Sequence, residues 1–366
     1  MPGGRGSSGR DISGQKMLPG GASMKRINLA LQGGGAHGAF TWGALDRLLE
    51  EDGIEIAAIA GTSAGALNAA VLKSGMAAGG AEGARAALDT LWGEIGAVTD
   101  TRFAGWIGGF SGSVPGLAKA IELSPAFIAF DMTTRMLSPY IYGPMLRNPL
   151  EKILAQVDFD AVQSDAGPEL HIGATNVRSG KIRVFTGGDV VPGAILASAC
   201  LPTLFQAVEI EDPKTGRTEA YWDGGYTGNP ALFPLFRPDL PGDIVIVNIN
   251  PLHREELPHD VQAIQNRINE ISFNSSLLRE LRAIDFVRRL IEGGTIPEAA
   301  MKRVLVHMVA DDTLMNDLNV ATKTIPAPII LSRLKAAGRS AMGNFLEMHA
   351  SDIGVRGTVD LAEMFG

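Results

Sequence analysis

The chain has 366 residues, 45% of them hydrophobic, so it is long enough to bury a large core or to divide into more than one domain. Its net charge of −8 argues against a nucleic-acid partner and against simple electrostatic attraction to anionic lipid. The single cysteine, Cys200, excludes a framework of internal disulfides and suits a reducing, cytoplasmic compartment. Because Cys200 lies in an apolar run, we expect it to be a small core residue.

The first 23 residues are rich in glycine, serine and arginine and lack the apolar stretch of a secretory signal. We expect residues 1–23 to be a disordered extension, or a misplaced start that makes Met24 the true beginning. No later segment offers an uncharged apolar span long enough for a bilayer. Residues 54–72 come closest, but they are rich in small and hydroxylated side chains and include Glu55.

A predicted strand over residues 26–31 runs directly into the glycine-rich sequence QGGGAHG at residues 32–38, and apolar residues at helical spacing follow. Glycines expose backbone N–H groups without side-chain obstruction, as anion binding requires. Gly33, Gly35 and Gly38 also match GxGxxG, the dinucleotide fingerprint. A Rossmann unit would place an acidic residue at the end of the second strand, whereas the second strand here ends in a serine turn. A nucleotide-binding module is therefore the weaker interpretation of this loop.

The second predicted strand ends in GTSAG at residues 61–65, and a helix follows through residue 72. This is the GxSxG pattern of a nucleophile elbow, in which a strained strand-to-helix turn presents the hydroxyl of Ser63. Gly61 and Gly65 allow the turn and the approach of a substrate carbonyl. The N–H of Ala64, at the start of the helix, could face a developing oxyanion. The alternative is an N-capping serine in an ordinary glycine-rich corner.

The segment between about residues 75 and 149 has a less regular pattern, and we expect an insertion that borders the site. Its aromatic residues would fill the core beneath the insertion or form a cap that presents apolar surface to acyl chains, and we expect the first role for most of them. These aromatic and apolar residues are Phe103, Trp106, Ile107, Phe110, Phe127, Phe130, Tyr140 and Tyr142.

Strand patterns alternate with helical ones along the rest of the chain, which predicts an α/β layered fold with a mainly parallel sheet. The predicted strands cover residues 26–31, 56–60, 171–176, 181–185, 205–210, 219–222, 244–249 and 303–309. Further helices are predicted over residues 191–199, 261–291 and 329–349.

Three motifs now coincide: the glycine run after the first strand, GTSAG after the second, and DGG, formed by Asp223, Gly224 and Gly225, after a later one. In order, strand context and spacing they resemble the patatin-like phospholipase family over about residues 26–250. That resemblance implies a three-layer α/β/α fold with a helical, apolar insertion. It also implies a serine-dependent lipid acyl hydrolase that needs no metal or cofactor. The catalytic core would cover residues 24–250, with residues 251–366 as a mostly helical part packed on it.

The resemblance also implies roles for single residues. Ser63 would be the nucleophile and Asp223 the general base of a Ser-Asp dyad. The oxyanion hole would be built from Gly33, Gly34, Gly35 and Ala64. Many members of the family carry arginine where this chain has His37, and the first of their four glycines is Gln32 here. This departure puts the charge stabilisation beside the oxyanion site in question.

An ordinary α/β-hydrolase with a Ser-His-Asp triad is the main enzymatic alternative. Four histidines follow Asp223, namely His253, His259, His307 and His349, and none of them sits at a convincing turn after a strand. For either mechanism the expected partner is a lipid ester. A peripheral contact of this cytoplasmic protein with a lipid surface would be apolar and made through residues 101–149.

Overall fold

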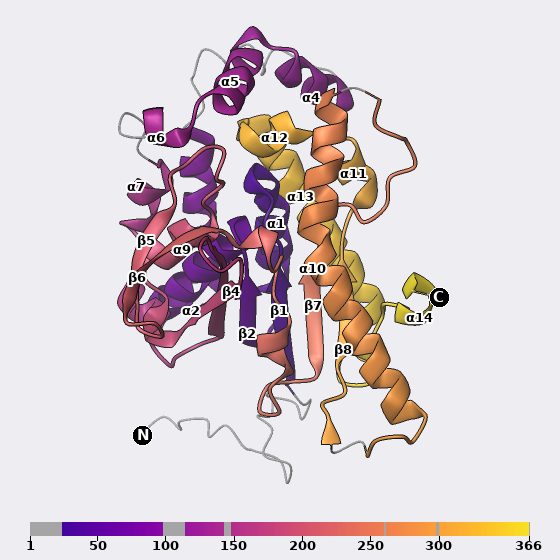
Figure 1. Cartoon of the computed structure of the whole chain (residues 1–366). Coiled ribbons are helices and arrows are strands. Elements are labelled where there is room, and N and C mark those ends of the chain that lie inside the picture. The colour runs from indigo at the N-terminus through magenta and orange to yellow at the C-terminus, as the bar shows by residue number, and fades with distance from the viewer. Residues whose placement is uncertain (1–23, 98–113, 143–147, 260, 298–299, 366) are drawn as a thin grey trace, which may run out of the picture.

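The computed structural model describes residues 24–97, 114–142, 148–259, 261–297 and 300–365 (Figure 1). The predicted extension over residues 1–23 lies outside the described residues. The same holds for four residues of the insertion, namely Phe103, Trp106, Ile107 and Phe110, and for the side chains of Phe130 and Tyr142.

One sheet of eight strands runs through the described part of the molecule. Five strands pair in parallel in the order β3-β2-β1-β7-β8, and β4, β5 and β6 join by antiparallel pairing at the β3 side. The strands are β1 (Lys25–Leu31), β2 (Ile54–Gly61), β3 (Glu169–Asn176), β4 (Ile182–Thr186), β5 (Val208–Asp212), β6 (Arg217–Asp223), β7 (Asp243–Val247) and β8 (Leu305–Val309). The prediction of a mainly parallel α/β sheet is confirmed.

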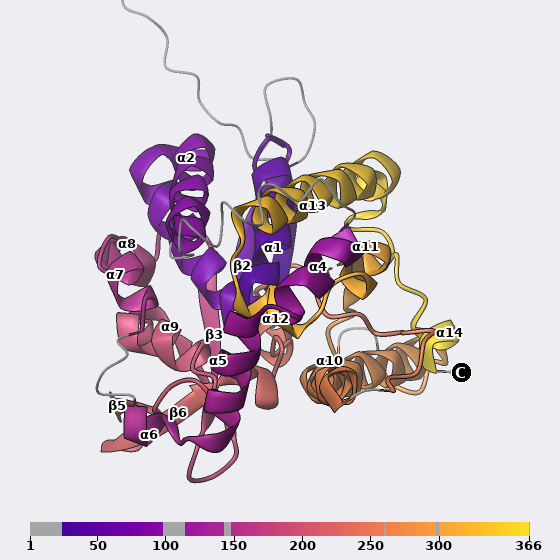
Figure 2. The same ribbon diagram turned by 90° about the horizontal axis from the view of Figure 1, so that it is seen from above.

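Helices cover both faces of this sheet (Figures 1 and 2). Because side chains alternate along a strand, Leu29 and Leu31 of β1 pack in one core cluster and Ala30 in the other. The first cluster is completed by α1 (Gly38–Leu48), α2 (Ala64–Ala97), α9 (Pro192–Ser198) and α13 (Pro328–His349), and the second mainly by α10 (Val261–Glu292). This arrangement is the three-layer α/β/α fold that the family resemblance implies.

The shorter helices lie mostly around the carboxyl ends of the parallel strands. They are α4 (Val114–Glu122), α5 (Pro125–Met136), α6 (Pro139–Tyr142), α7 (Leu150–Leu154), α8 (Phe159–Gln163), α11 (Asp312–Asn316), α12 (Val320–Thr324) and α14 (Leu361–Phe365). At the top of Figure 1, α4 and α5 pass over the end of the sheet, above α12. The C-terminal part supplies β8 to the sheet and α13 to the layer that covers it.

The helix that follows the serine turn is longer than the sequence pattern indicates. It continues through residues 75–97, which the pattern leaves irregular, and it bends back at Gly79 and Gly80. After the bend the two halves pack closely, since a Cβ on Gly75 would lie 2.6 Å from the carbonyl oxygen of Gly83. Glycine and alanine dominate this stretch, so it lacks the bulky apolar periodicity by which an amphipathic helix is recognised.

Strands β2 and β6 approach each other along one edge of β3. Ile172 pairs with Gly61 of β2, and Ala174 pairs with Asp223 of β6, while β4 pairs with both of these β3 residues. A strand has only two edges, so β4 occupies one of them and β2 and β6 share the other. Since β2 is parallel and β6 antiparallel to β3, their carboxyl ends meet on either side of Gly173. The turns after the two strands are thereby brought together.

Helices α1 and α13 cross with their backbones in direct contact, because a Cβ on Gly338 would collide with the carbonyl oxygen of Phe40. We expect Gly338→Ala to lower the free energy of unfolding by about 1–3 kcal/mol through overpacking. Gly343 on the same helix has open space, its nearest neighbour being Arg47 Nε at 3.9 Å. Gly343→Ala should therefore raise stability by up to about 1 kcal/mol through helix propensity. Urea denaturation measures both, and equal midpoints for the two variants would contradict this packing.

Candidate active site

Ser63 lies at the tip of the turn between β2 and α2. Its φ of +53° is the only positive value for a non-glycine residue in the described chain, and such strain is typical of functional sites. Its N–H donates to Ser198 Oγ at 2.9 Å, and the Ser198 hydroxyl donates to the carbonyl oxygen of Gly173 at 2.6 Å. A Cβ on Gly65 would collide with the carbonyl oxygen of Leu31, so the turn requires glycine there. Sequence reasoning missed the role of Ser198.

Asp223 is the last residue of β6 and caps the short 3₁₀ turn Gly224–Tyr226. Its side chain is 1% exposed, and its Oδ1 accepts the N–H of Gly225 at 2.7 Å. Burial raises the pKa of Asp223 to about 7, and hydrogen bonds from the Gly225 N–H and the Ser63 hydroxyl partly offset that rise. Ser63 is therefore close enough to Asp223 to influence the pKa of its carboxyl group. A Cβ on Gly224 would collide with the carbonyl oxygen of Gly173, which explains the first glycine of DGG.

The glycine run after β1 faces Ser63, but its members differ in what their N–H groups do. The N–H of Gly33 donates to Asn229 Oδ1 at 2.7 Å. Gly33 is an expected oxyanion donor, but its N–H is already engaged in this bond. Gly34, Gly35 and Ala64 line the same cavity as Ser63, and their N–H groups make no hydrogen bond to the described residues. The φ of +58° at Gly35 requires glycine at that position.

Gln32, which stands where the family has a further glycine, holds this loop in place. Its Oε1 accepts the N–H groups of Ile249 (2.8 Å) and Asn250 (3.0 Å). Asn250 Nδ2 in turn donates to the carbonyl oxygen of Gly33 at 2.8 Å. The loop is therefore fixed to the end of β7 by side chains that no local motif reveals.

A cavity of about 650 Å³ opens beside Ser63 and Asp223. This volume is in the range of small-molecule sites. Its walls are largely apolar and include Leu67, Trp92, Ile95, Phe127, Phe205 and Phe273. Phe127 comes from α5 and is 2% exposed, so the insertion borders the cavity as expected, and this aromatic residue packs in the core. Tyr140, by contrast, is 61% exposed.

A known protein family matches the part of the chain that carries Ser63 and Asp223. Residues 29–236, more than half of the chain, match the family model described as patatin-like phospholipase. The chain belongs to the patatin-like phospholipase family. Among solved structures, VipD from Legionella pneumophila aligns with 93% of this chain and 70% of its own, at 15% sequence identity and a TM-score of 0.40. No curated protein matches. Family membership supports a lipid hydrolase in broad terms.

The six histidines of this patatin-like protein all lie in described segments, and none of them lines the cavity. His307 is buried against Asp243 Oδ1 at 3.0 Å, and His349 pairs with Asp352. His253 and His259 are exposed. The structure therefore offers no histidine to a Ser-His-Asp triad in the part of the chain that it describes.

His37 is buried beside the glycine run, where its Nε2 lies 2.9 Å from the hydroxyl of Thr322. Burial holds the pKa of His37 well below its ordinary value, and the positive charges of Lys323 and Arg254 lower it further. The ring is therefore neutral near pH 7 and brings no positive charge to the site. Position 37 thus supplies no substitute for the charge of the family's arginine.

Cys200 is buried as expected, and burial raises the pKa of its thiol to about 12. Within the described ranges no cluster of three or more His, Cys, Asp or Glu side chains could hold a metal ion. Of the helices that the structure describes, none has both the length and the apolar character needed to cross a bilayer.

Proposed function

We propose that this protein is a serine-dependent lipid acyl hydrolase of the phospholipase A or lysophospholipase type, with Ser63 and Asp223 as a catalytic dyad. The observation that carries the proposal is that Ser63, in its strained turn, and the buried carboxylate of Asp223 line the same largely apolar cavity. A carboxylate whose pKa is raised to about 7 accepts a proton near neutral pH more readily than an ordinary aspartate does.

The reaction follows a ping-pong course. Ser63 Oγ attacks the ester carbonyl while Asp223 takes its proton, and the free N–H groups of Gly34, Gly35 and Ala64 hold the tetrahedral oxyanion. Asp223 then returns the proton to the leaving alcohol as the acyl-enzyme forms. In the second half Asp223 takes a proton from the attacking water, and it returns that proton to Ser63 Oγ as the acyl–serine bond breaks and the fatty acid is released. The apolar walls of the cavity suit the acyl chain.

Activity on a panel of esters tests the proposed function. We expect turnover of phospholipid, lysophospholipid and short-chain p-nitrophenyl esters, measured against Ser63→Ala as the blank. Turnover equal to that of the blank on every ester would reject the proposal.

The triad alternative is tested by replacing each histidine separately. If one of these variants loses turnover while Asp223→Asn keeps most of it, the dyad is wrong.

The cavity is flanked by exposed apolar side chains, and we propose that they contact the lipid surface. On α5, α6 and the link between them these are Met132, Met136, Leu137, Tyr140 and Ile141, and on α10 they are Val261, Ile264, Ile268 and Ile271. The α10 residues recur at helical spacing on one face, while Gln265, Asn269 and Phe273 of the same helix line the cavity. The surface expected in residues 101–149 is thus extended by a second helix.

Charge substitutions test this contact. Ile268 is 53% exposed near the cavity, and Phe286 is 55% exposed about five turns further along the same helix. We expect Ile268→Glu to weaken binding to neutral phosphatidylcholine vesicles about tenfold, because an ionised carboxylate does not enter the apolar boundary of the membrane. Hydrolysis of a soluble ester should be unchanged. Phe286→Glu should leave vesicle binding intact, and equal losses in a flotation assay would contradict the assignment.

A further inference from the structure

We propose that Lys323 on α12 supplies the positive charge of the oxyanion site. This inference rests on the proposed function, since it assigns a role in the same reaction. Lys323 lies outside residues 29–236, which match the family, and no motif marks it. Among the described residues that line the cavity, Lys323 is the only cation and Asp223 the only carboxylate.

The backbone of α12 packs directly on the glycine run. A Cβ on Gly35 would collide with the carbonyl oxygen of Lys323, and the neighbouring Thr322 hydroxyl bonds to His37. Asn319 closes α12 with a capping box, so the start of this short helix is fixed. Backbone packing therefore fixes Lys323 beside the predicted oxyanion donors.

Lys323 lines the cavity, and its side chain reaches Asn250 and Glu270. Its Nζ donates to Asn250 Oδ1 at 3.2 Å, and that oxygen lies 3.7 Å from the place a Cβ would take on Gly34, so the ammonium is within about 7 Å of Gly34. At that separation, in a partly desolvated site, a unit charge interacts appreciably with an oxyanion. The Lys323 side chain is 19% exposed, so water screens it only in part.

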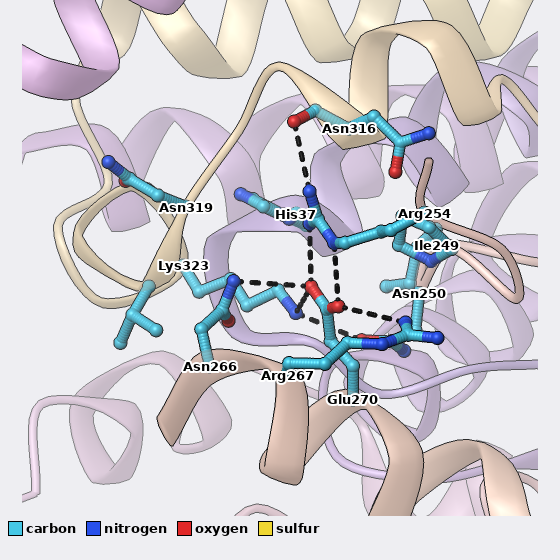
Figure 3. A network of polar contacts seen from close by, with 12 residues as sticks. His37, Ile249, Asn250, Arg254, Asn266, Arg267, Glu270, Asn316, Asn319 and Lys323 are labelled. Carbon is cyan, nitrogen blue, oxygen red and sulfur yellow. Dashed lines mark hydrogen bonds and ion pairs between the residues drawn. The ribbon is translucent and has the colours of Figure 1, made fainter. Parts of the chain in front are cut away.

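The charges around Lys323 do not cancel. The buried carboxylate of Glu270 is shared by three cations: Arg254 at 2.7 Å, Arg267 at 3.3 Å and Lys323 at 3.8 Å. Figure 3 shows these side chains turned toward Glu270. Three cations therefore face one carboxylate, and neutral His37 adds no charge. The cluster leaves a net positive charge beside the glycine run.

This placement favours the transition state over the ground state. During attack the negative charge leaves Asp223, which gains the serine proton, and appears on the substrate oxygen held by the glycine run. Asp223 is bonded by Gly225, whereas the Lys323 ammonium is bonded to Asn250 beside Gly34, so its charge lies on the side toward which the negative charge moves. Catalysis requires this kind of differential interaction.

Substitution of Lys323 tests the inference on a neutral, soluble ester such as p-nitrophenyl butyrate. We expect Lys323→Met to lower kcat about ten- to a hundredfold with little change in KM, and Lys323→Arg to keep most of the rate. The matched control is Lys335→Met, since Lys335 is 24% exposed, pairs with Asp89 and lies outside the cavity lining. A kcat for Lys323→Met within about twofold of wild type would overturn the inference.

Two further readouts distinguish an oxyanion role from a headgroup contact or a purely structural role. Burial lowers the pKa of Lys323, so the ammonium loses its proton at a lower pH than an exposed lysine does. The kcat of the wild type should fall as this proton is lost, and Lys323→Arg should lack that fall. This profile decides the matter even if Lys323→Met does not fold. A loss confined to phospholipid substrates, with the neutral ester unaffected, would assign Lys323 to a headgroup phosphate and overturn its oxyanion role. A wild-type enzyme no faster than Ser63→Ala would instead reject the proposed function.

Discussion

Replacing Asp223 by asparagine is expected to remove most of the activity and, at the same time, to stabilise the fold. Loss of the general base should lower kcat by at least about 10³-fold, because Ser63 then has no proton acceptor. The stability gain follows from burial. The carboxyl ionises near pH 4 in the unfolded chain and near pH 7 in the native state, so the native state carries an unfavourable charge at high pH.

The sign of this effect depends on pH in a way that can be measured. The penalty is absent below about pH 4, grows between about pH 4 and 7 and is complete above pH 7, where it is on the order of 1–4 kcal/mol. Urea denaturation should therefore show Asp223→Asn to be more stable than wild type at pH 8 and nearly equal at pH 4. A less stable asparagine variant at pH 8 would contradict the raised pKa of Asp223.

Asp212 provides the opposite control. It is 2% exposed, like Asp223, but it accepts a bidentate pair from Arg183 at 2.8 and 2.9 Å, and this pairing lowers the pKa of Asp212. A lowered pKa contributes stability above the pKa of the unfolded chain, and that stability is lost as the pH falls. Asp212→Asn should therefore destabilise the protein at pH 8. Two buried aspartates thus respond to the same substitution with opposite signs.

Ser63→Ala is expected to lower kcat on a soluble ester by at least about 10⁴-fold, because it removes the hydroxyl that forms the acyl-enzyme in the proposed mechanism. The fold should persist, since the Ser63 N–H still reaches Ser198. Ser63→Gly should be equally inactive but about 1 kcal/mol more stable, because glycine adopts a φ of +53° without strain. Initial rates and thermal melting of the two variants provide the check. Residual turnover by Ser63→Ala above about 1% of wild type would assign the nucleophile elsewhere.

The sequence predicts those parts of the site that depend on local rules. A serine between two glycines at the end of a strand and a DGG turn after a later strand are both local, because close backbone contacts leave no room for larger residues at Gly65 and Gly224. The orientation of the strand that carries Asp223 does not follow from local sequence rules. The sequence pattern favours parallel strands, whereas β6 is antiparallel and meets β2 end to end along β3.

The residues whose roles sequence reasoning missed act across long separations. Asn229 takes the N–H of Gly33, Gln32 and Asn250 fix the loop, and Lys323 arrives from a helix near the end of the chain. None of these polar residues stands in a periodic pattern or a spacing rule. Only the fold shows that the N–H of Gly33 is engaged, whereas those of Gly34 and Gly35 have no hydrogen-bond partner among the described residues. This changes the expected set of oxyanion donors.

Covalent labelling of Ser63 by a fluorophosphonate, followed by mass spectrometry across pH, tests the dyad most directly. We predict one adduct on Ser63 whose rate of formation rises with pH to a plateau with a midpoint near 7, because ionised Asp223 must take the proton. Asp223→Asn should label at least about a hundredfold more slowly. An adduct on another residue would contradict the dyad. So would a labelling rate that is independent of pH and unchanged in Asp223→Asn.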